Sequence, residues 1–317
     1  MTAGDALRIA ARFGVDGIAA NELGGGWVNE NWLVESRKGE RFVVRRYDRL
    51  HVTRRAVFFE HAIMLHAAQR VPEVRPPLAA ADGDTIVFED GRFFAVLPYV
   101  AGRTGDRGAA ADAARVLARF HLALAAFRPA RPRAARSVGA LAWLRDRFLR
   151  FAAQPHLARK LDWDALVVGV TRALTRVLPH AGRLPLATVH GDPHPDNVVV
   201  ADGRVRALLD FDFAHETERL YDVASGADAF GRAVEGAPLD LAAALGFANA
   251  YQAEARLTDE EWELVPDLMI RRNAFLVWYI VSRHGQRAFG DVGNADRYAR
   301  RVAELDGLRA EWRRRPA

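Results

Sequence analysis

The sequence contains no cysteine among its 317 residues. This absence excludes disulfides, thiolate metal sites and thiol nucleophiles, so any chemistry must use oxygen and nitrogen groups. Long apolar runs are also missing, because no stretch approaches the roughly 20 residues that cross a bilayer. The N-terminal segment MTAGDALRIAARFG lacks the apolar core of a signal peptide. We therefore expect a cytoplasmic protein that has no membrane partner.

Lysine is nearly absent, since Lys38 and Lys160 are its only two occurrences. Lys and Arg together number 45 against 40 Asp and Glu, and the net charge of +5 has the sign that nucleic-acid binding requires. The arginines, however, are scattered through almost every segment and interleaved with acids. This pattern indicates a general bias for arginine over lysine, and we expect no nucleic-acid partner.

Residues 1–97 have the pattern of a small lobe built from strands around one helix. Three segments are rich in β-branched and aromatic residues, and a fourth repeats its apolar residues with helical spacing. The expected strands are 41–47, 85–90 and 92–100, and the expected helix is 54–70. Asp90-Gly91 joins the last two strands, and this dipeptide suits a tight hairpin because it readily adopts positive φ.

The segment 98–102, within LPYVAGRT, has the pattern of a hinge, because a turn with glycine closes the last strand. From 103 to 317 the segments are rich in Ala, Leu and Arg and have helical periodicity. We expect helices at 106–126, 141–153, 159–179, 239–255, 259–286 and 291–313, with a Pro- and Arg-rich loop at 127–137. One hairpin, VVVADGRVRALLDFD, turns at Asp202-Gly203. The sequence therefore predicts an α+β protein of two lobes, a small antiparallel sheet followed by a mostly helical lobe.

The strongest pattern is VHGDPHPDN (189–197), followed after the hairpin by LLDFD (208–212). An apolar strand end delivers Asp192 into a proline-rich loop that cannot be helical, and Asn197 follows five residues later. The antiparallel strands of the hairpin bring Asn197, at its entrance, close to Asp210, at its exit. We expect these side chains to meet.

Phosphoryl transfer requires this set of groups. A carboxylate must orient the attacking hydroxyl and accept its proton, and oxygen ligands must hold the Mg²⁺ that neutralises phosphate charge. Asp192 fits the first task as the catalytic base, and Asn197 and Asp210 fit the second as metal ligands. The spacing Asp-x-x-x-x-Asn equals that of the kinase catalytic loop.

A different interpretation makes His190, Asp192 and His194 ligands of a two-metal hydrolase. Such a centre needs further clusters of His and Asp, and the other histidines show no ligand spacing. We expect His190 to organise the loop through hydrogen bonds.

HGDPHPDN with LLDFD resembles the aminoglycoside phosphotransferase and choline kinase superfamily, whose motif reads HGDxxxxN followed by a strand that ends in Asp-Phe. The resemblance runs through most of the chain and extends to the homoserine-kinase-like branch. It implies a protein-kinase-like fold, with residues 1–97 as the nucleotide-binding lobe and 103–317 carrying the catalytic loop and the acceptor site. It also implies an ATP- and Mg²⁺-dependent phosphotransferase that acts on the hydroxyl of a small molecule, such as an antibiotic, an amino acid or a metabolite.

The resemblance also implies a nucleotide site. LGGGWVNENWLV is similar to the glycine-rich loop, whose backbone approaches the phosphates closely because glycine lacks a Cβ. RFVVRRY is similar to the strand that carries the phosphate-binding lysine, FFEHAIML to the helix with its glutamate partner, and LPYVAGRT to the hinge that meets adenine. The cofactor-binding residues implied in this way are Gly24, Gly25, Gly26, Asn29, Arg45, Glu60, Pro98 and Val100. In ERLYDVAS, Asp222 would be a carboxylate that anchors a helix.

Two positions depart from the family pattern. Arg45 stands where the family has lysine, so a planar guanidinium would contact the α/β-phosphates in place of a point charge. Asp212 stands where a protein kinase has glycine, which fits the small-molecule branch better. Three roles are open to Asp212: a contact in the metal shell, a contact to the acceptor, or a structural role.

No motif identifies the acceptor. The acidic cluster TDEEWE (258–263) would suit a polycationic aminoglycoside, but its Thr and the Glu three residues later also form the pattern of a helix capping box. Further along the same expected helix, Arg272, Tyr279 and Arg283 recur at spacings of seven and four on one face. This face is either a contact between lobes or an acceptor site for a carboxylate-bearing alcohol such as homoserine, because guanidinium groups bind carboxylates bidentately.

Two other functions stay open, a Ser/Thr protein kinase resembling bacterial stress-response kinases and a catalytically silent nucleotide-binding protein. Nothing between Asp210 and Asp222 resembles an activation loop. The intact set of Asp192, Asn197 and Asp210 favours an active enzyme.

Overall fold

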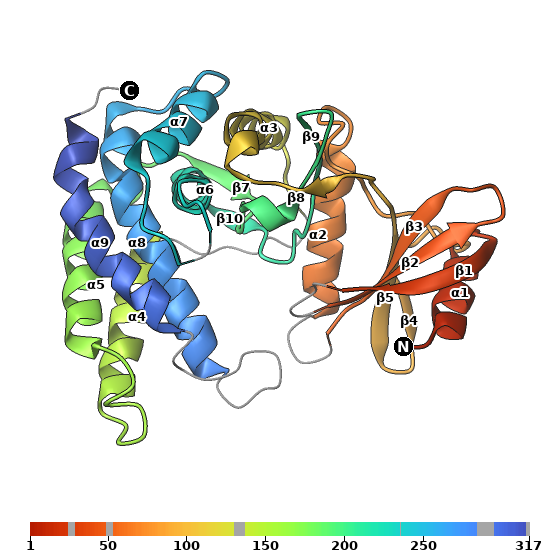
Figure 1. Cartoon of the computed structure of the whole chain (residues 1–317), viewed down its shortest axis with the longest axis horizontal. Coiled ribbons are helices and arrows are strands. Elements are labelled where there is room, and N and C mark those ends of the chain that lie inside the picture. The colour runs from red at the N-terminus through yellow and green to blue at the C-terminus, as the bar shows by residue number, and fades with distance from the viewer. Residues whose placement is uncertain (25–28, 49–52, 130–136, 235, 284–294, 315–317) are drawn as a thin grey trace.

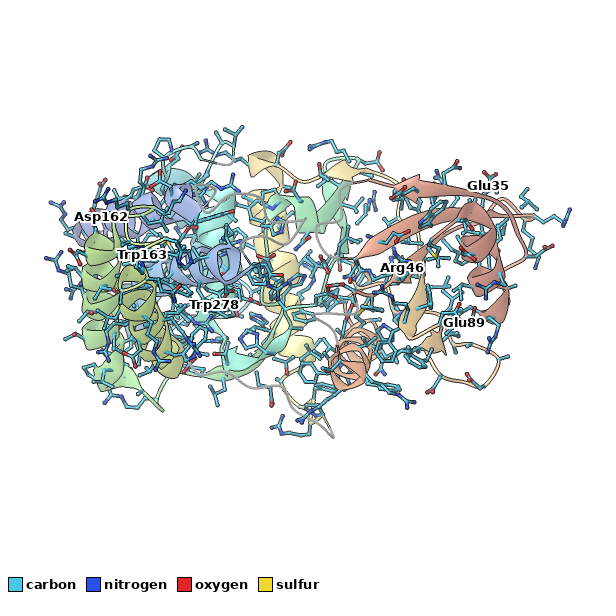
Figure 2. The ribbon with its side chains drawn as sticks, turned by 90° about the horizontal axis from the view of Figure 1, so that it is seen from below. Glu35, Arg46, Glu89, Asp162, Trp163 and Trp278 are labelled. Atoms are coloured by element: carbon cyan, nitrogen blue, oxygen red, sulfur yellow. The ribbon has the colours of Figure 1, made fainter. Side chains whose placement is uncertain are left out.

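The structure is a computed structural model that describes residues 1–24, 29–48, 53–129, 137–234, 236–283 and 295–314. It has two lobes (Figure 1), a sheet with two helices and a larger, mostly helical part. In Figure 2, Glu35 and Glu89 lie toward the outer end of the small lobe, and Asp162 and Trp163 toward the opposite end of the molecule. The two-lobed α+β fold predicted from the sequence is confirmed, and the boundaries at 97 and 103 stay a prediction.

The small lobe is a five-stranded antiparallel sheet of order β1-β2-β3-β5-β4. Its elements are α1 Ala3–Arg12, β1 Gly17–Leu23, β2 Glu30–Ser36, β3 Arg41–Arg46, α2 Arg54–Ala67, β4 Val87–Glu89 and β5 Arg92–Pro98. The expected strands and helix are confirmed, whereas α1, β1 and β2 were not predicted. The expected hairpin turn is also confirmed, since Asp90 and Gly91 have φ of 49° and 72°.

The two faces of this sheet have different partners. Helix α1 covers one face, where Ile9 packs with Val34, Val44 and other buried side chains. Helix α2 packs beside the other face, and its Ile63 also belongs to the core of the large lobe. Arg45, which alternates with Val44 along β3, therefore points toward the side of the sheet that meets α2 and the large lobe.

The large lobe contains helices α3 Ala110–Ala123, α4 Ser137–Ala152, α5 Trp163–Val177, α6 Leu220–Phe230, α7 Leu241–Gln252, α8 Asp259–Ser282 and α9 Asp296–Arg313. Its 3₁₀ turns are η1 Arg107–Ala109, η2 Leu178–His180 and η3 Pro195–Asn197. Its strands are β6 Arg103–Thr104, β7 Leu186–Val189, β8 Val198–Ala201, β9 Arg204–Leu208 and β10 His215–Glu218. The six expected helices and the hairpin at Asp202-Gly203 are confirmed. The expected loop at 127–137 falls mostly outside the described residues.

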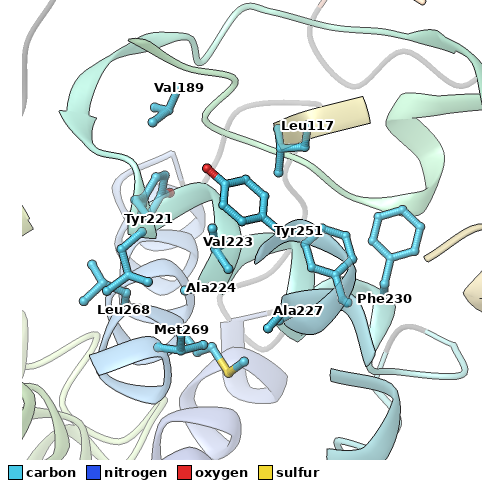
Figure 3. Close-up of a cluster of buried hydrophobic side chains, with 14 of the residues drawn as sticks. Leu117, Val189, Tyr221, Val223, Ala224, Ala227, Phe230, Tyr251, Leu268 and Met269 are labelled. Carbon is cyan, nitrogen blue, oxygen red and sulfur yellow. The ribbon is translucent and has the colours of Figure 1, made fainter. Parts of the chain in front are cut away.

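Helix α6 was not predicted, because nearly all its side chains are buried and its apolar residues do not follow a helical stripe. Figure 3 shows the cluster around it, in which Val223 and Ala227 of α6 lie among Leu117, Tyr251 and Val189. Val189 is the last residue of β7. The core of the large lobe therefore fixes the strand end from which the loop HGDPHPDN leaves.

Helix α8 begins at the expected capping box, in which the Thr258 hydroxyl accepts from the Glu261 amide and the Glu261 carboxylate accepts from the Thr258 amide. Pro266 lies inside this helix and has no N–H to donate to the Trp262 carbonyl. The indole N–H of Trp312, in α9, donates to that carbonyl at 3.0 Å. The bond satisfies the exposed acceptor and fixes α9 against α8. Among the described residues, no helix is long and apolar enough to cross a membrane.

Candidate active site

The catalytic loop leaves β7 through Gly191, which has φ of +89°. A Cβ at this position would lie 2.2 Å from the Phe213 carbonyl oxygen, so both the backbone conformation and the space require glycine. Asp222, in α6, accepts hydrogen bonds from the backbone N–H groups of His190 and Gly191 at 2.6 and 2.9 Å. The loop is therefore held in place by a residue that lies about 30 positions further along the chain.

Asp222 is completely buried and is the centre of a hydrogen-bond network. Its carboxylate also accepts from His121 Nε2 at 3.0 Å, and His121 Nδ1 lies 2.8 Å from the Tyr251 hydroxyl. Burial acts to raise the pKa of Asp222, but the hydrogen bond and charge of His121, with the loop amides, hold the pKa below its ordinary value. Asp222 was expected to anchor a helix, and its contacts connect that helix to the loop.

His190 has both ring nitrogens engaged. Nε2 donates to the Leu209 carbonyl at 2.9 Å, and Nδ1 accepts from the Asp192 N–H at 3.3 Å. Burial lowers the pKa of His190, so the ring is neutral, and it lies 4.6 Å from the ring of Phe211. This geometry suits the expected organising role. It leaves no nitrogen for a metal, and within the described residues no group of three His, Asp or Glu side chains could hold one.

Asp192 has a contact at each carboxylate oxygen. Oδ1 accepts from Arg272 Nη2 at 2.9 Å, and Oδ2 lies 3.3 Å from His194 Nε2. Burial acts to raise the pKa of Asp192, but His194 and Arg272 outweigh it and hold the pKa well below its ordinary range. Asp192 is therefore a carboxylate at neutral pH, as a proton acceptor must be.

Asn197 and Asp210 lie close together, as the hairpin predicts, because the Leu209 N–H donates to the Asn197 carbonyl at 2.8 Å. The side-chain amide of Asn197 donates to the Asp192 carbonyl at 3.0 Å, so its oxygen is the atom that can meet a cation. Asp210 has φ of 61° and a side chain that is 41% exposed. One amide oxygen and one carboxylate fit Mg²⁺, which takes few protein ligands and keeps waters.

Arg45 extends from the small lobe into a group of carboxylates. Its Nη1 lies 3.4 Å from Asp210, 3.5 Å from Glu60 and 3.6 Å from Asp212. Burial and the neighbouring Asp212 raise the pKa of Glu60 well above its ordinary value, whereas burial and Asp210 raise the pKa of Asp212 to about 6. The structure thus brings Arg45 and Glu60 together, as the resemblance implied.

Asp212, a residue of the large lobe, faces the small lobe. The amide of Asn29 donates to Asp212 at 2.5 Å, and the carbonyl of the same amide accepts from the Asp48 N–H at 3.1 Å. A cavity of about 300 Å³ opens beside this contact and is lined in part by Gly24, Asn29 and Tyr47. These contacts favour a role for Asp212 beside the metal and phosphates over a contact to the acceptor.

The remaining expected nucleotide contacts are less constrained. A Cβ on Gly24 would meet nothing within 4 Å, so the surroundings do not explain a glycine there, and Gly25 and Gly26 lie outside the described residues. Pro98 pairs with Phe42 at the end of β5, and Val100 follows it. Their contacts to adenine stay a prediction.

Of the expected face of α8, Arg272 borders the loop that carries Asp192. A small cavity of about 20 Å³ is bordered by Gly191, Asp192, Phe213, Tyr221, Arg272, Phe275 and Leu276. Tyr279 stands edge-on to Phe213 at 5.8 Å, and the Arg283 guanidinium lies 4.1 Å from the centre of the Tyr279 ring. Arg272, Tyr279 and Arg283 therefore follow one another outward from Asp192 along the helix.

Sequence reasoning did not single out Phe213, Tyr221 or Arg271 near this cavity. Arg271 is buried, and its guanidinium stacks 3.6 Å from the centre of the Tyr221 ring. Two of the three positions carried a usable signal, since Phe213 follows DFD and Tyr221 precedes Asp222. Arg271 carried none, because its importance depends on which side of α8 faces α6.

Comparison with known proteins gives concordant results. The model of the phosphotransferase enzyme family matches residues 19–260. The homoserine kinases of Polaromonas naphthalenivorans and Caulobacter vibrioides are each 28% identical over 259 residues, which cover 80% and 79% of this chain and 78% and 77% of the relatives. A microcompartment-associated aminopropanol kinase superposes with a TM-score of 0.72 at 16% identity, over 98% of this chain and 99% of that one. An amicoumacin kinase in complex with AMP-PNP and Ca²⁺ superposes with a TM-score of 0.71 at 15% identity, over 96% and 93%.

Proposed function

Because the chain belongs to the phosphotransferase enzyme family, we propose that it transfers the γ-phosphate of ATP, with Mg²⁺, to the hydroxyl of a small hydroxy acid of the homoserine type. The observation that carries the acceptor class is the position of Arg272, which borders the small cavity at the catalytic loop and donates to Asp192 at 2.9 Å. The similarity of this chain to relatives named homoserine kinase supports the same acceptor class.

The nucleotide side is assigned to residues from both lobes. Asn197 and Asp210 would hold Mg²⁺, with Asp212 beside them, and the ion would neutralise charge on the phosphates. Arg45 is the cation nearest these carboxylates, and Glu60 positions it. A guanidinium offers two parallel N–H groups to a phosphate, so Arg45 suits contacts with the α/β-phosphates.

Asp192 is the catalytic base. It accepts the proton of the acceptor hydroxyl while the hydroxyl oxygen forms a bond to the γ-phosphorus and the bond from that phosphorus to ADP breaks. The backbone of the loop is fixed by Asp222 and His190, so the carboxylate is held before the acceptor arrives. This arrangement supplies positioning, which is most of what phosphoryl transfer asks of a protein.

The charges near Asp192 favour an anionic acceptor over a polycation. The acidic cluster at 258–263 begins α8, where Glu261 serves the capping box and pairs with Arg219 at 2.7 Å. It is therefore occupied in holding α8 and α6 together. Near Asp192, by contrast, α8 presents Arg272. A guanidinium attracts the carboxylate of a ligand and repels the ammonium groups of a polycation.

The short segment between Asp210 and Asp222 argues against a protein kinase. It contains β10, which pairs directly with β7 through residues 215–218 and leaves no room for a long activation loop. The same pairing holds the loop that carries Asp192. A small-molecule acceptor therefore fits this lobe better than a peptide.

The test is an ATP-consumption assay with homoserine, choline, kanamycin and a generic protein substrate. We expect homoserine or a related hydroxy acid to stimulate ADP formation at least tenfold more than kanamycin does, with phosphorylated product detected by mass spectrometry. Addition of EDTA should abolish transfer because the metal ligands are assigned to Mg²⁺. Stronger stimulation by kanamycin than by any hydroxy acid would overturn the acceptor class.

A further inference from the structure

The catalytic carboxylate is already in an ion pair with the residue that we assign to the acceptor. Arg272 Nη2 lies 2.9 Å from Asp192 Oδ1, while His194 contacts Oδ2. The Arg272 side chain is 8% exposed and the Asp192 side chain 24%, so the guanidinium is the more deeply buried partner. Both oxygens of the carboxylate are therefore engaged, and a substrate hydroxyl must displace one of these contacts before it can donate to Asp192.

The two arginines at this pair keep donors without a partner among the described residues, although Asp228 lies near Arg272, and Glu218 and Asp222 lie near Arg271. Arg272 and Arg271 are both buried, and within the described residues Arg272 Nε and Arg271 Nε and Nη1 have no hydrogen-bond partner. A buried donor without a partner costs about 1–3 kcal/mol, and more when it is charged. Asp192 pairs with Nη2 of Arg272 and leaves the Nε edge without an acceptor in the described part of the chain, and a second anion fits that edge.

We propose that Arg272 is released from Asp192 by the acceptor's own carboxylate, so that binding of the correct acceptor activates the base. This inference rests on the proposed function and adds a regulatory step to it. The acceptor carboxylate pairs with the Nε edge of Arg272 and draws the guanidinium away from Asp192. Asp192 then turns to the hydroxyl of the same molecule.

The pair also protects ATP when no acceptor is bound. Hydrolysis requires a water oxygen to bond to the γ-phosphorus, a water proton to pass to Asp192, and the bond to ADP to break, giving ADP and phosphate. With Asp192 held by Arg272, this reaction is slow. A carboxylate ligand without a hydroxyl should therefore release Asp192 and let water take the place of the missing acceptor.

The first experiment uses the wild-type enzyme with ATP and 2-aminobutyrate, which is homoserine without its hydroxyl. We expect phosphate release several-fold above that with ATP alone, and a rise in melting temperature on binding of 2-aminobutyrate. 1-Aminopropane, which lacks the carboxylate, is the matched control and should do neither. Binding of 2-aminobutyrate without stimulation of hydrolysis would overturn the proposal.

The second experiment uses Arg272→Met, which keeps the length and removes the charge. We expect hydrolysis of ATP without acceptor to rise several-fold, 2-aminobutyrate to have no further effect, and the KM for homoserine to rise tenfold or more. For each of these measurements, Arg272→Lys should give a value between those of the wild type and Arg272→Met. Arg309→Met is the matched control, because Arg309 also pairs with an aspartate of α8, Asp267, at 3.1 Å, but outside the acceptor cavity.

The two hypotheses can fail separately. If wild-type enzyme phosphorylates homoserine but Arg272→Met and Arg272→Lys leave the rate without acceptor unchanged, the release of Asp192 is wrong and the function stands. If no hydroxy acid is phosphorylated, the acceptor class is wrong. The rate of Arg272→Met with ATP alone then still decides whether Arg272 restrains Asp192, because that measurement contains no acceptor.

Discussion

At the scale of single residues, the hydrogen bonds that each side chain already makes limit the role that it can have in the site. Asn197 uses its amide nitrogen on the Asp192 carbonyl, which leaves the oxygen for a cation. His190 uses both nitrogens on backbone groups, which excludes it as a base or ligand. Asp192 is the carboxylate of the HGD motif that lines the acceptor cavity. The assignment of the base therefore rests on Asp192.

Asp192→Asn tests that assignment. The amide keeps the size of the side chain and still accepts from Arg272, but it cannot take up the proton of the acceptor hydroxyl. We expect kcat to fall by about 10²–10⁴, while the Kd for ATP, measured by calorimetry, changes less than twofold. Asp196→Asn, at an exposed position of the same loop, should keep both values. A kcat near that of the wild type would refute the role of Asp192.

At the scale of elements, α6 positions the loop that does the chemistry. Asp222 receives two backbone N–H groups from the loop and a third donor from His121 in α3. On the other side of the same helix, buried Asp228 pairs with Arg232 at 2.8 Å and accepts from Asn273 of α8. One helix thus has two buried carboxylates, of which only the first contacts the catalytic loop.

Asp222→Asn should destabilise the fold and lower turnover. Asparagine has one acceptor oxygen and turns an N–H group toward a donor, so at least one buried donor loses its partner, at a cost of about 2–3 kcal/mol. We expect this loss in the free energy of unfolding by urea denaturation, together with a lower kcat. Asp267→Asn, at a buried aspartate of α8 that pairs with Arg176 and Arg309, is the matched control, with lower stability but an unchanged kcat. A full kcat in Asp222→Asn would contradict the role in positioning.

The difference in stability between the wild type and Asp222→Asn should depend on pH. The folded pKa of Asp222 lies below its unfolded value of about 3.9, so its carboxylate stabilises the fold fully above that pH. This contribution is lost as the pH falls through the lower folded pKa. We therefore expect the stability difference between wild type and Asp222→Asn to be constant above about pH 5 and to shrink below about pH 4.

At the scale of the whole molecule, Arg45 connects the lobes. It lies in β3 of the small lobe, and its guanidinium reaches Asp210 and Asp212 of the large lobe. A single cation between three carboxylates, including Glu60, leaves negative charge, which suits a site that binds Mg²⁺ with a nucleotide. The neighbouring Arg46 points to the other face and pairs with Glu30 (Figure 2 labels Arg46).

Arg45→Ala should weaken the binding of ATP far more than the binding of adenosine, because adenosine lacks the phosphates that Arg45 is proposed to contact. Arg45→Lys should restore part of the difference, since a point charge replaces the guanidinium without its paired geometry. Both affinities are measured by calorimetry at fixed Mg²⁺. Arg37→Ala, at an exposed pair with Asp16 away from the cavity, is the matched control and should change neither affinity. Equal losses for ATP and adenosine would mean that Arg45 has a structural role alone.

The sequence by itself determined the parts of the protein that depend on neighbours along the chain. The hairpin turns at Asp90-Gly91 and Asp202-Gly203, the capping box of α8 and the approach of Asn197 to Asp210 all follow from local backbone preferences. The motif HGDPHPDN named the catalytic loop for the same reason, because its residues are covalently close. Strong helical periodicity gave six helices of the large lobe.

Tertiary structure alone decided which distant residues meet. Asp192 and Arg272 are 80 positions apart, Asp222 and the loop amides about 30, and Arg45 and Asp210 are 165. The packing of α6 and α8 fixes the first two pairs, and the docking of the lobes fixes the third. The sequence pattern predicts which residues share one face of a helix. It does not predict which element packs against that face, because packing depends on all the side chains between the two elements. That is why the sequence predicted an arginine face on α8, and only the fold put Arg272 next to Asp192.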